Sequence, residues 1–153
     1  MGFDVMGHKP KTEKGEYFRN NVWWWRPLWG YVAKQCQDIL TEKEIQAGRF
    51  NDGVLISAKK TREIGLRLRF LIDQKEVKKF EDEYQKYLNS LPDEPCELCS
   101  STGKRNDQFV QGDCNGCEGK GKKRPWACSY PFNEENVKEF AEFAIESGGF
   151  RIC

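Results

Sequence analysis

Two pairs of cysteines, each with the spacing Cys-x-x-Cys, constrain the fold of this chain more than any other feature. The pairs are Cys96 with Cys99 and Cys114 with Cys117, and fourteen residues lie between them. A Cys-x-x-Cys turn directs two thiolates at one metal ion, and two such turns complete the tetrahedral shell that zinc prefers. Because sulfur fills all four positions and leaves none for water, the spacing predicts one structural zinc ion per chain.

The cysteine count, the hydropathy and the net charge indicate the cellular compartment and the partners to expect. Seven cysteines are an odd number, and in a reducing compartment thiols hold metals or lie buried more often than they form disulfides. No apolar run is long enough to cross a bilayer and the first residues lack the order of a signal peptide, so we expect a cytoplasmic protein without a membrane partner. A net charge of +1 indicates no general attraction to nucleic acid. We expect Cys36 in the core, Cys153 as a free thiol, and Cys128 without a partner at ligand spacing.

Helical periodicity and capping signals predict five helices. Leu28, Val32 and Cys36 recur at helical spacing after Pro27, which suits the first turn of a helix. The other helices are indicated by N-cap residues, by apolar stripes and by glycine or proline stops. The predicted helices span about 28–40, 41–48, 57–72, 76–89 and 133–147, with a turn at 51–53.

One short strand, at residues 2–7, is the only β element that alternation predicts. The fold class expected from the sequence is therefore mainly α with a small β element. We expect a single domain over residues 1–153, with a zinc-binding hairpin at 95–124 inserted between two helices that pack together.

The second cysteine pair begins a longer motif, Cys114-Asn-Gly-Cys-Glu-Gly-Lys-Gly121, and residues 96–103 form an imperfect copy with Ser101 in place of the first glycine. This motif resembles the Cys-x-x-Cys-x-Gly-x-Gly repeat of the cysteine-rich domain of DnaJ-type chaperones. That family carries four repeats and two zinc ions, whereas two repeats are present here, and the His-Pro-Asp signature of the J-domain is absent. The resemblance implies a local zinc hairpin and does not imply co-chaperone activity.

The whole chain also resembles a family of small uncharacterised phage-type proteins. The resemblance rests on the opening Met-Gly-Phe-Asp-Val, on residues 15–28 (GEYFRNNVWWWRPL), on the two cysteine pairs and on the ending Ser-Gly-Gly-Phe at 147–150. It implies a cytoplasmic protein of a host cell that binds and modulates or inhibits a host protein or a defence complex.

Four of the five tryptophans lie within seven residues, which is the most unusual stretch of the chain. Large aromatics beside a helix start usually anchor a core, but three consecutive indoles cannot all point to one side of the backbone. Exposed tryptophan and arginine are frequent at protein interfaces. The leading hypothesis is therefore a non-enzymatic protein-interaction module, with candidate contact residues Trp23, Trp24, Trp25, Arg19 and Arg26.

Two alternative functions remain open from the sequence. A basic cluster after the second cysteine pair favours a nucleic-acid-binding zinc protein, with contacts from Lys120, Lys122, Lys123 and Arg124. An enzyme would need a polar pocket near the tryptophans, to which Asp4, Arg19, Asn20, Asn21 and Asp52 could contribute. The single histidine, His8, is a poor candidate for a general base, so no catalytic residue is predicted.

Overall fold

The computed structural model describes every residue from 1 to 153, and the contacts divide the chain into two units. Unit 1 comprises Met1–Gln85 and Tyr130–Cys153, and unit 2 comprises Lys86–Ser129. Unit 2 is wider than the span 95–124 expected for the zinc hairpin, because it includes the end of helix α4 (Glu76–Ser90) and the 3-10 helix η3 (Trp126–Ser129). No helix is long and apolar enough to cross a membrane.

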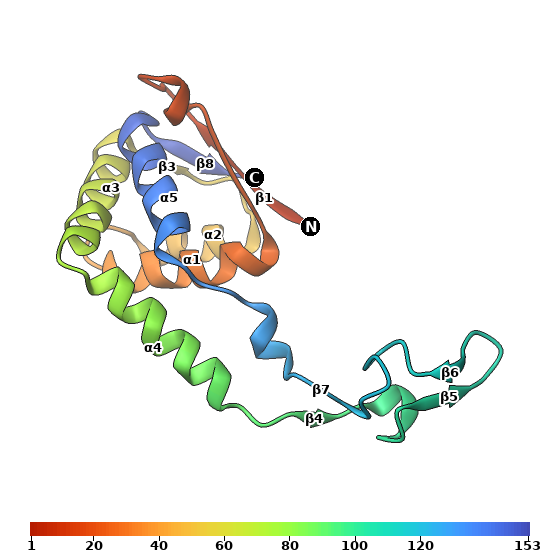
Figure 1. Cartoon of the computed structure of the whole chain (residues 1–153). Coiled ribbons are helices and arrows are strands. Elements are labelled where there is room, and N and C mark those ends of the chain that lie inside the picture. Colours follow the sequence, from red (N-terminus) through yellow and green to blue (C-terminus); the bar gives the residue numbers. More distant parts are fainter. The chain divides into compact units, whose positions relative to one another are not determined.

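Unit 1 contains a four-stranded antiparallel sheet with the order β2-β1-β8-β3 (Figure 1). Its strands are β1 (Gly2–Gly7), β2 (Tyr17–Asn21), β3 (Leu55–Ile56) and β8 (Phe150–Ile152). Phe3 and Val5 are buried between more exposed neighbours, so one face of β1 lies against the core. The strand expected at 2–7 is confirmed, and the three other strands of this sheet make the β part larger than the small element expected, so the fold is mixed α/β with a largely helical chain.

The five α-helices confirm that the chain is largely helical. They are α1 (Val22–Gln35), α2 (Glu42–Phe50), α3 (Ala58–Asp73), α4 and α5 (Glu134–Glu146). Thr41, Ser57 and Asn133 cap α2, α3 and α5 through side-chain oxygens that accept backbone N–H groups, as expected from the sequence. A short 3-10 helix, η1 (Glu13–Gly15), lies between β1 and β2.

The predicted bounds of the first helix, 28–40, are wrong. The helix begins at Val22, where Asn21 is the N-cap and its side-chain oxygen accepts the amides of Trp23 and Trp24 at 3.1 Å each. Pro27 therefore lies inside the helix, where it removes one backbone hydrogen bond. The burial of Trp25 and its neighbours along the same helix outweighs that local cost.

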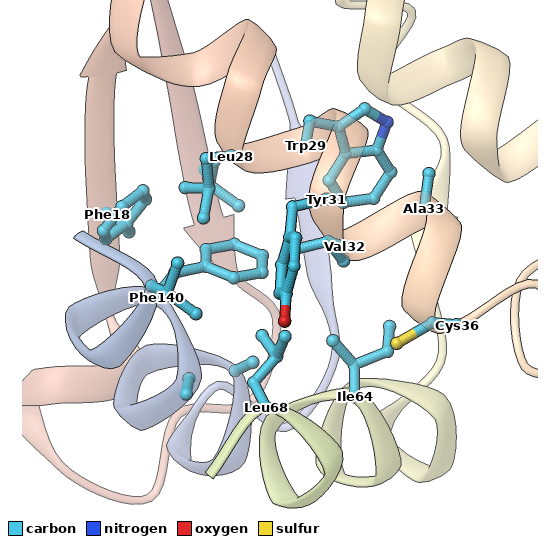
Figure 2. Packing of buried hydrophobic residues seen from close by; sticks show 14 of the residues in the cluster. Phe18, Leu28, Trp29, Tyr31, Val32, Ala33, Cys36, Ile64, Leu68 and Phe140 are labelled. Atoms are coloured by element: carbon cyan, nitrogen blue, oxygen red, sulfur yellow. The ribbon is translucent and has the colours of Figure 1, made fainter. Parts of the chain in front are cut away.

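The core of unit 1 is formed by α1, α3, α5 and the sheet. Tyr31 and Val32 of α1 face Ile64 and Leu68 of α3, and Phe140 of α5 lies beside them (Figure 2). These side chains come from segments far apart in the sequence, so their burial holds the unit together.

Gly65 lets α3 approach α5 closely. A Cβ atom at this position would lie 2.5 Å from Cγ1 of Ile145 and 2.7 Å from the carbonyl oxygen of Ala141. No larger residue than glycine fits between the two helices at this point.

Glu44 joins α2 to α3 through a nearly buried ion pair. Its carboxylate accepts the Thr41 amide at 2.8 Å, which completes a capping box, and lies 2.7 Å from Nζ of Lys60. Burial of Glu44 raises the pKa of its carboxyl group, but the hydrogen bonds from Lys60 and Thr41 together outweigh burial and lower that pKa below 4.5. The ionised form of Glu44 is therefore the stabilising one.

We expect Glu44 to make unit 1 sensitive to acid. A carboxyl pKa that is lower in the folded than in the unfolded state adds stability above the unfolded value of 4.5, and this stability is lost as the pH falls through the folded pKa. Glu44→Gln should lower the free energy of unfolding at pH 7 by about 1–3 kcal/mol and weaken its dependence on pH between about 5 and 3. Urea denaturation at several pH values measures both effects. Glu42→Gln, an exposed change in the same helical turn, is the control, and equal losses in the two variants would contradict this role of Glu44.

Candidate metal centre

The four paired cysteines lie in two knuckles within unit 2. The first knuckle contains the 3-10 helix η2 (Glu97–Cys99), and a two-stranded hairpin of β5 (Lys104–Asn106) and β6 (Gln111–Asp113) leads to the second. The chain enters and leaves through a second antiparallel pair, β4 (Glu94–Pro95) with β7 (Lys122–Lys123). The two strand pairs bring cysteines that are eighteen residues apart to one point.

The four sulfur atoms form one buried cluster. All Sγ atoms lie within 4.8 Å of one another. The distance from Cys96 Sγ to Cys114 Sγ is 3.9 Å, and that from Cys99 Sγ to Cys117 Sγ is 3.8 Å. A tetrahedral site with metal–sulfur bonds of about 2.3 Å places its sulfurs about 3.8 Å apart. The cluster could therefore hold one metal ion, and it uses the four cysteines expected from the sequence.

The two knuckles have the same backbone conformation, so the sequence repeat is also a structural repeat. Ser101 donates its amide to the Cys96 carbonyl at 3.0 Å, and Gly119 donates to Cys114 at the same distance. Ser101 and Gly119 both have left-handed backbones, with φ of 65° and 78°. Each knuckle is also bonded to the other, because the Cys96 amide donates to Gly121 O at 3.0 Å and the Cys114 amide donates to Gly103 O at 2.8 Å.

Backbone amides donate to two of the sulfur atoms. Gly103 N donates to Cys99 Sγ at 3.3 Å, and Gly121 N donates to Cys117 Sγ at 3.1 Å. Burial raises the pKa of the Cys99 thiol, but the Gly103 amide and the other three cysteines outweigh burial and lower this pKa to about 7. At Cys117 burial prevails and raises the pKa to about 11. Four thiolates this close repel one another, so full ionisation of the cluster requires a cation among them.

The second glycine of each motif is required by contact between the knuckles. A Cβ atom on Gly121 would lie 2.4 Å from the Ser101 carbonyl oxygen, and one on Gly103 would lie 2.3 Å from the Gly119 carbonyl oxygen. The position of the first glycine is less restricted, because Ser101 already carries a side chain there. This difference explains why the first copy of the motif tolerates serine at 101 but retains glycine at 103.

The remaining cysteines lie outside the cluster. Cys36 is fully buried in unit 1, and burial raises the pKa of its thiol to about 11, which agrees with a core residue rather than a nucleophile. Cys128 is half-buried, and its sulfur lies 3.7 Å from the Leu88 carbonyl oxygen and 3.5 Å from Nη2 of Arg124. Cys153 is exposed.

The basic residues after the second knuckle are mostly paired with acidic side chains, and only Lys123 lacks an ion pair. The nitrogen-to-oxygen distances are 3.3 Å for Lys120–Glu118, 3.6 Å for Lys122–Asp93 and 2.9 Å for Arg124–Asp93. The Arg124 guanidinium also donates to the carbonyls of Leu88 at 2.6 Å and Leu91 at 2.7 Å. Arg124 therefore stabilises the base of unit 2.

The three consecutive tryptophans of unit 1 differ in burial. Trp25 is fully buried, whereas Trp23 and Trp24 are half-buried. Trp23 packs on Tyr130 with ring centroids 5.1 Å apart, and Trp25 stacks on Phe3 at 5.4 Å. The structure thus separates one core residue from two that reach the surface.

The polar residues considered for an enzyme pocket have separate structural contacts. Asp4 accepts the Tyr17 hydroxyl and lies 3.5 Å from Nε of Arg19. Asn20 exchanges two side-chain hydrogen bonds with Asn136, at 3.0 and 2.8 Å. Asn21 caps α1, and Asp52 follows the end of α2. The cavity that Asn20 lines beside Trp24 and α5 contains no other member of this set.

Phe109, which sequence reasoning missed, lies in the turn between β5 and β6 and is 81% exposed. Asp107 shapes this turn, because its Oδ1 accepts the amides of Phe109 at 2.8 Å and Val110 at 3.0 Å. Arg105 holds Asp107 through its guanidinium at 2.7 Å. The signal available in the sequence was an aspartate two residues before an aromatic, which is typical of an Asx turn.

The structural repeat supplies a test of the contact between the knuckles. Gly121→Ala should lower the free energy of unfolding of unit 2 by about 1–3 kcal/mol, because its Cβ would clash with the Ser101 carbonyl. The matched control is Gly119→Ala, which has nearly the same φ and corresponds to Ser101 in the other knuckle. Metal affinity and thermal unfolding measure the difference, and equal effects of the two changes would contradict the proposed contact.

Comparisons of the chain with protein-family models, with curated proteins and with solved structures gave no significant match, so the metal centre is interpreted from its own geometry.

Proposed function

We propose that this chain is a zinc-binding, non-enzymatic protein-interaction module. The observation that supports this proposal best is the closed cluster of four buried sulfurs, whose separations fit a single tetrahedral ion. Four thiolates from two Cys-x-x-Cys knuckles are soft ligands, and such sets select zinc over magnesium or calcium. With four protein ligands the ion has no open position for water or substrate, so its role is structural.

The metal would take the place of a hydrophobic core in unit 2. The buried cluster in this unit consists of the four cysteines alone, whereas unit 1 has an extensive apolar core. A segment of this size buries too little apolar surface to fold on that basis, and structural zinc commonly supplies the missing free energy. The zinc ion would therefore hold the two knuckles and, through them, the β5–β6 hairpin.

The hairpin turn supports a binding role, because it presents an apolar side chain on an ordered backbone. Phe109 is 81% exposed, and Asp107 holds the amide of Phe109 in place. Aromatic side chains often contribute most of the binding energy at protein interfaces, and a turn that is already ordered loses little entropy on binding. We infer that Phe109 contacts the partner, with Trp23, Trp24, Arg19 and Arg26 as a second candidate surface in unit 1.

The resemblance to phage-type proteins supports a host protein or a defence complex as the partner. A protein that modulates or inhibits such a target needs an exposed contact surface and no catalytic site. The exposed aromatic turn supplies such a contact surface.

Nucleic-acid binding is the alternative, and one cavity in unit 2 favours it. Lys120, Lys122, Lys123 and Arg124 line a hollow of about 310 Å³ beside the second knuckle. However, Asp93 and Glu118 line the same hollow and pair with three of these four residues. Neutralised lysines release few counterions from phosphate, so we rank this function second.

Purified protein should contain about one zinc ion per chain. Removal by a chelator should unfold unit 2 first, because unit 1 has its own apolar core, and most of the helical circular dichroism should remain. The double variant Cys114→Ser, Cys117→Ser should lose the metal, whereas Cys153→Ser, at an exposed position outside the cluster, should retain it. Elemental analysis measures the content, and zinc in the double variant equal to that of the wild type would refute the assigned site.

Phe109→Ser should weaken capture of a protein partner from host lysate by about tenfold, a loss of about 1.4 kcal/mol, without changing zinc content. Leu66→Ser, at an exposed apolar position of α3 in unit 1, is the control and should leave capture unchanged. The pull-down is carried out with and without nuclease. Loss of the complex after nuclease treatment would favour the nucleic-acid alternative over protein interaction.

A further inference from the structure

A cavity between α1 and α2 in unit 1 lies over two buried tryptophan rings and beside the exposed ring of Phe50. It encloses about 290 Å³, which is near the lower end of the range for small-molecule sites. The rings of Trp25 and Trp29 stack with centroids 5.4 Å apart and an interplanar angle of 11°. Both indole N–H groups are fixed, because Trp25 Nε1 donates to Gly48 O at 2.8 Å and Trp29 Nε1 donates to Ile45 O at 3.0 Å. The lining residues are Trp25, Arg26, Trp29, Gly30, Arg49 and Phe50.

Gly30 has no packing reason to be glycine, although it lies inside α1. The other two glycines within α-helices are required by close contacts: a Cβ on Gly48 would lie 2.1 Å from the Trp29 ring, and one on Gly65 would lie 2.5 Å from Ile145. A Cβ on Gly30 would meet no atom within 4 Å. Glycine inside a helix reduces stability relative to alanine. Gly30 is exposed, and its missing side chain leaves open space beside the cavity.

Two arginines with no acidic partner line the same cavity. Arg26 belongs to α1 and Arg49 to α2, both are exposed, and neither forms an ion pair within the chain. Arg62, Arg69 and Arg151 also lack an ion pair, but Arg26 and Arg49 line one cavity together. Two unpaired guanidinium groups beside an apolar hollow attract an anion and can bond its oxygen atoms in pairs.

Phe50 adds an exposed aromatic side chain to the lining of the cavity. Its side chain is 70% exposed at the end of α2, although a large apolar residue gains free energy by burial. A flat ligand ring that enters the cavity would cover this side chain. Aromatic rings and guanidinium planes both stack favourably on such a ring.

We propose that this cavity binds a small aromatic anion. The ring of the ligand lies against Phe50, in the space that Gly30 leaves open, and a carboxylate or phosphate group bonds Arg26 and Arg49. This binding site belongs to unit 1 and does not depend on the metal centre or on the Phe109 turn.

The test uses the full-length, zinc-loaded protein labelled with 15N and follows its indole N–H signals by nuclear magnetic resonance. The probes are adenosine 5′-monophosphate and indole-3-acetate, which carry a ring with a phosphate or a carboxylate. Adenosine and inorganic phosphate are the separate halves of the first probe. We expect one of the two anionic probes to shift the signals of Trp25 and Trp29 and to leave that of Trp126 in place. Each half alone should bind at least tenfold more weakly, and the probe that binds distinguishes phosphate from carboxylate ligands.

Variants connect the binding to the cavity. Arg26→Gln and Arg49→Gln should each weaken binding of the effective probe at least fivefold, whereas Arg62→Gln, an exposed arginine of α3 outside the cavity, should leave the affinity within twofold. Gly30→Leu should abolish binding by filling the space. Gly30→Ala should raise the thermal midpoint while it weakens binding, so a loss of affinity in that variant cannot be attributed to unfolding.

Three results would overturn the proposal. The first is the absence of any shift at Trp25 and Trp29 with both anionic probes at millimolar concentration. The second is unchanged affinity in a folded Gly30→Leu or Gly30→Ala variant, which would place the ligand elsewhere. The third is equal weakening by Arg62→Gln and the two cavity arginine variants, which would show that only the general charge of the protein matters.

Discussion

The indole of Trp25 is the point on which the packing of unit 1 depends. It stacks on Phe3 of β1 and on Trp29 of α1, meets Phe140 of α5 edge-on at 5.9 Å, and donates a hydrogen bond to the Gly48 carbonyl of α2. A single side chain thereby joins the sheet to three helices. Because the ring is fully buried and its polar N–H is satisfied, it adds apolar burial without an unpaired donor.

Unit 2 follows a different physical principle. Its buried cluster consists of four cysteines. Two backbone hydrogen bonds join the knuckles. Gly103 and Gly121 have no side chain, so each can lie against a backbone carbonyl of the opposite knuckle. A metal ion held by these sulfurs would order the unit by coordination rather than by burial of apolar area. At the base of unit 2, Arg124 and Lys122 form ion pairs with Asp93. Phe109, in the β5–β6 turn, is exposed.

The residues that favour binding, which are Phe109 and the two cavity arginines, are not the residues that form the cysteine cluster or the apolar core. In unit 2 the metal centre is closed and the exposed aromatic is at the hairpin turn. In unit 1 the rings of Trp25 and Trp29 are buried in the core, beneath a cavity whose two arginines have no ion pair within the chain.

Local signals in the sequence determined a large part of the structure. The spacing of the four cysteines was sufficient to identify the cluster that could hold a metal ion, because a Cys-x-x-Cys turn brings its two thiolates together without help from distant residues. The cap residues Thr41, Ser57 and Asn133 likewise marked the starts of three helices, because a cap bonds amides only two or three positions away. In the same way, the repeated motif contained the glycines that the contact between the knuckles requires.

Only the tertiary structure decided the features that depend on contacts between distant segments. Strands β3 and β8 are two and three residues long, too short for alternation to identify, and they exist because each pairs with a strand far away in the sequence. Tertiary burial also set the start of α1, because the gain from placing Trp25 in the core exceeds the local preference of Pro27 for a helix start. The cavity beside Gly30 has the same origin: its arginines lie twenty-three residues apart, and no periodicity in the sequence relates the two helices that carry them.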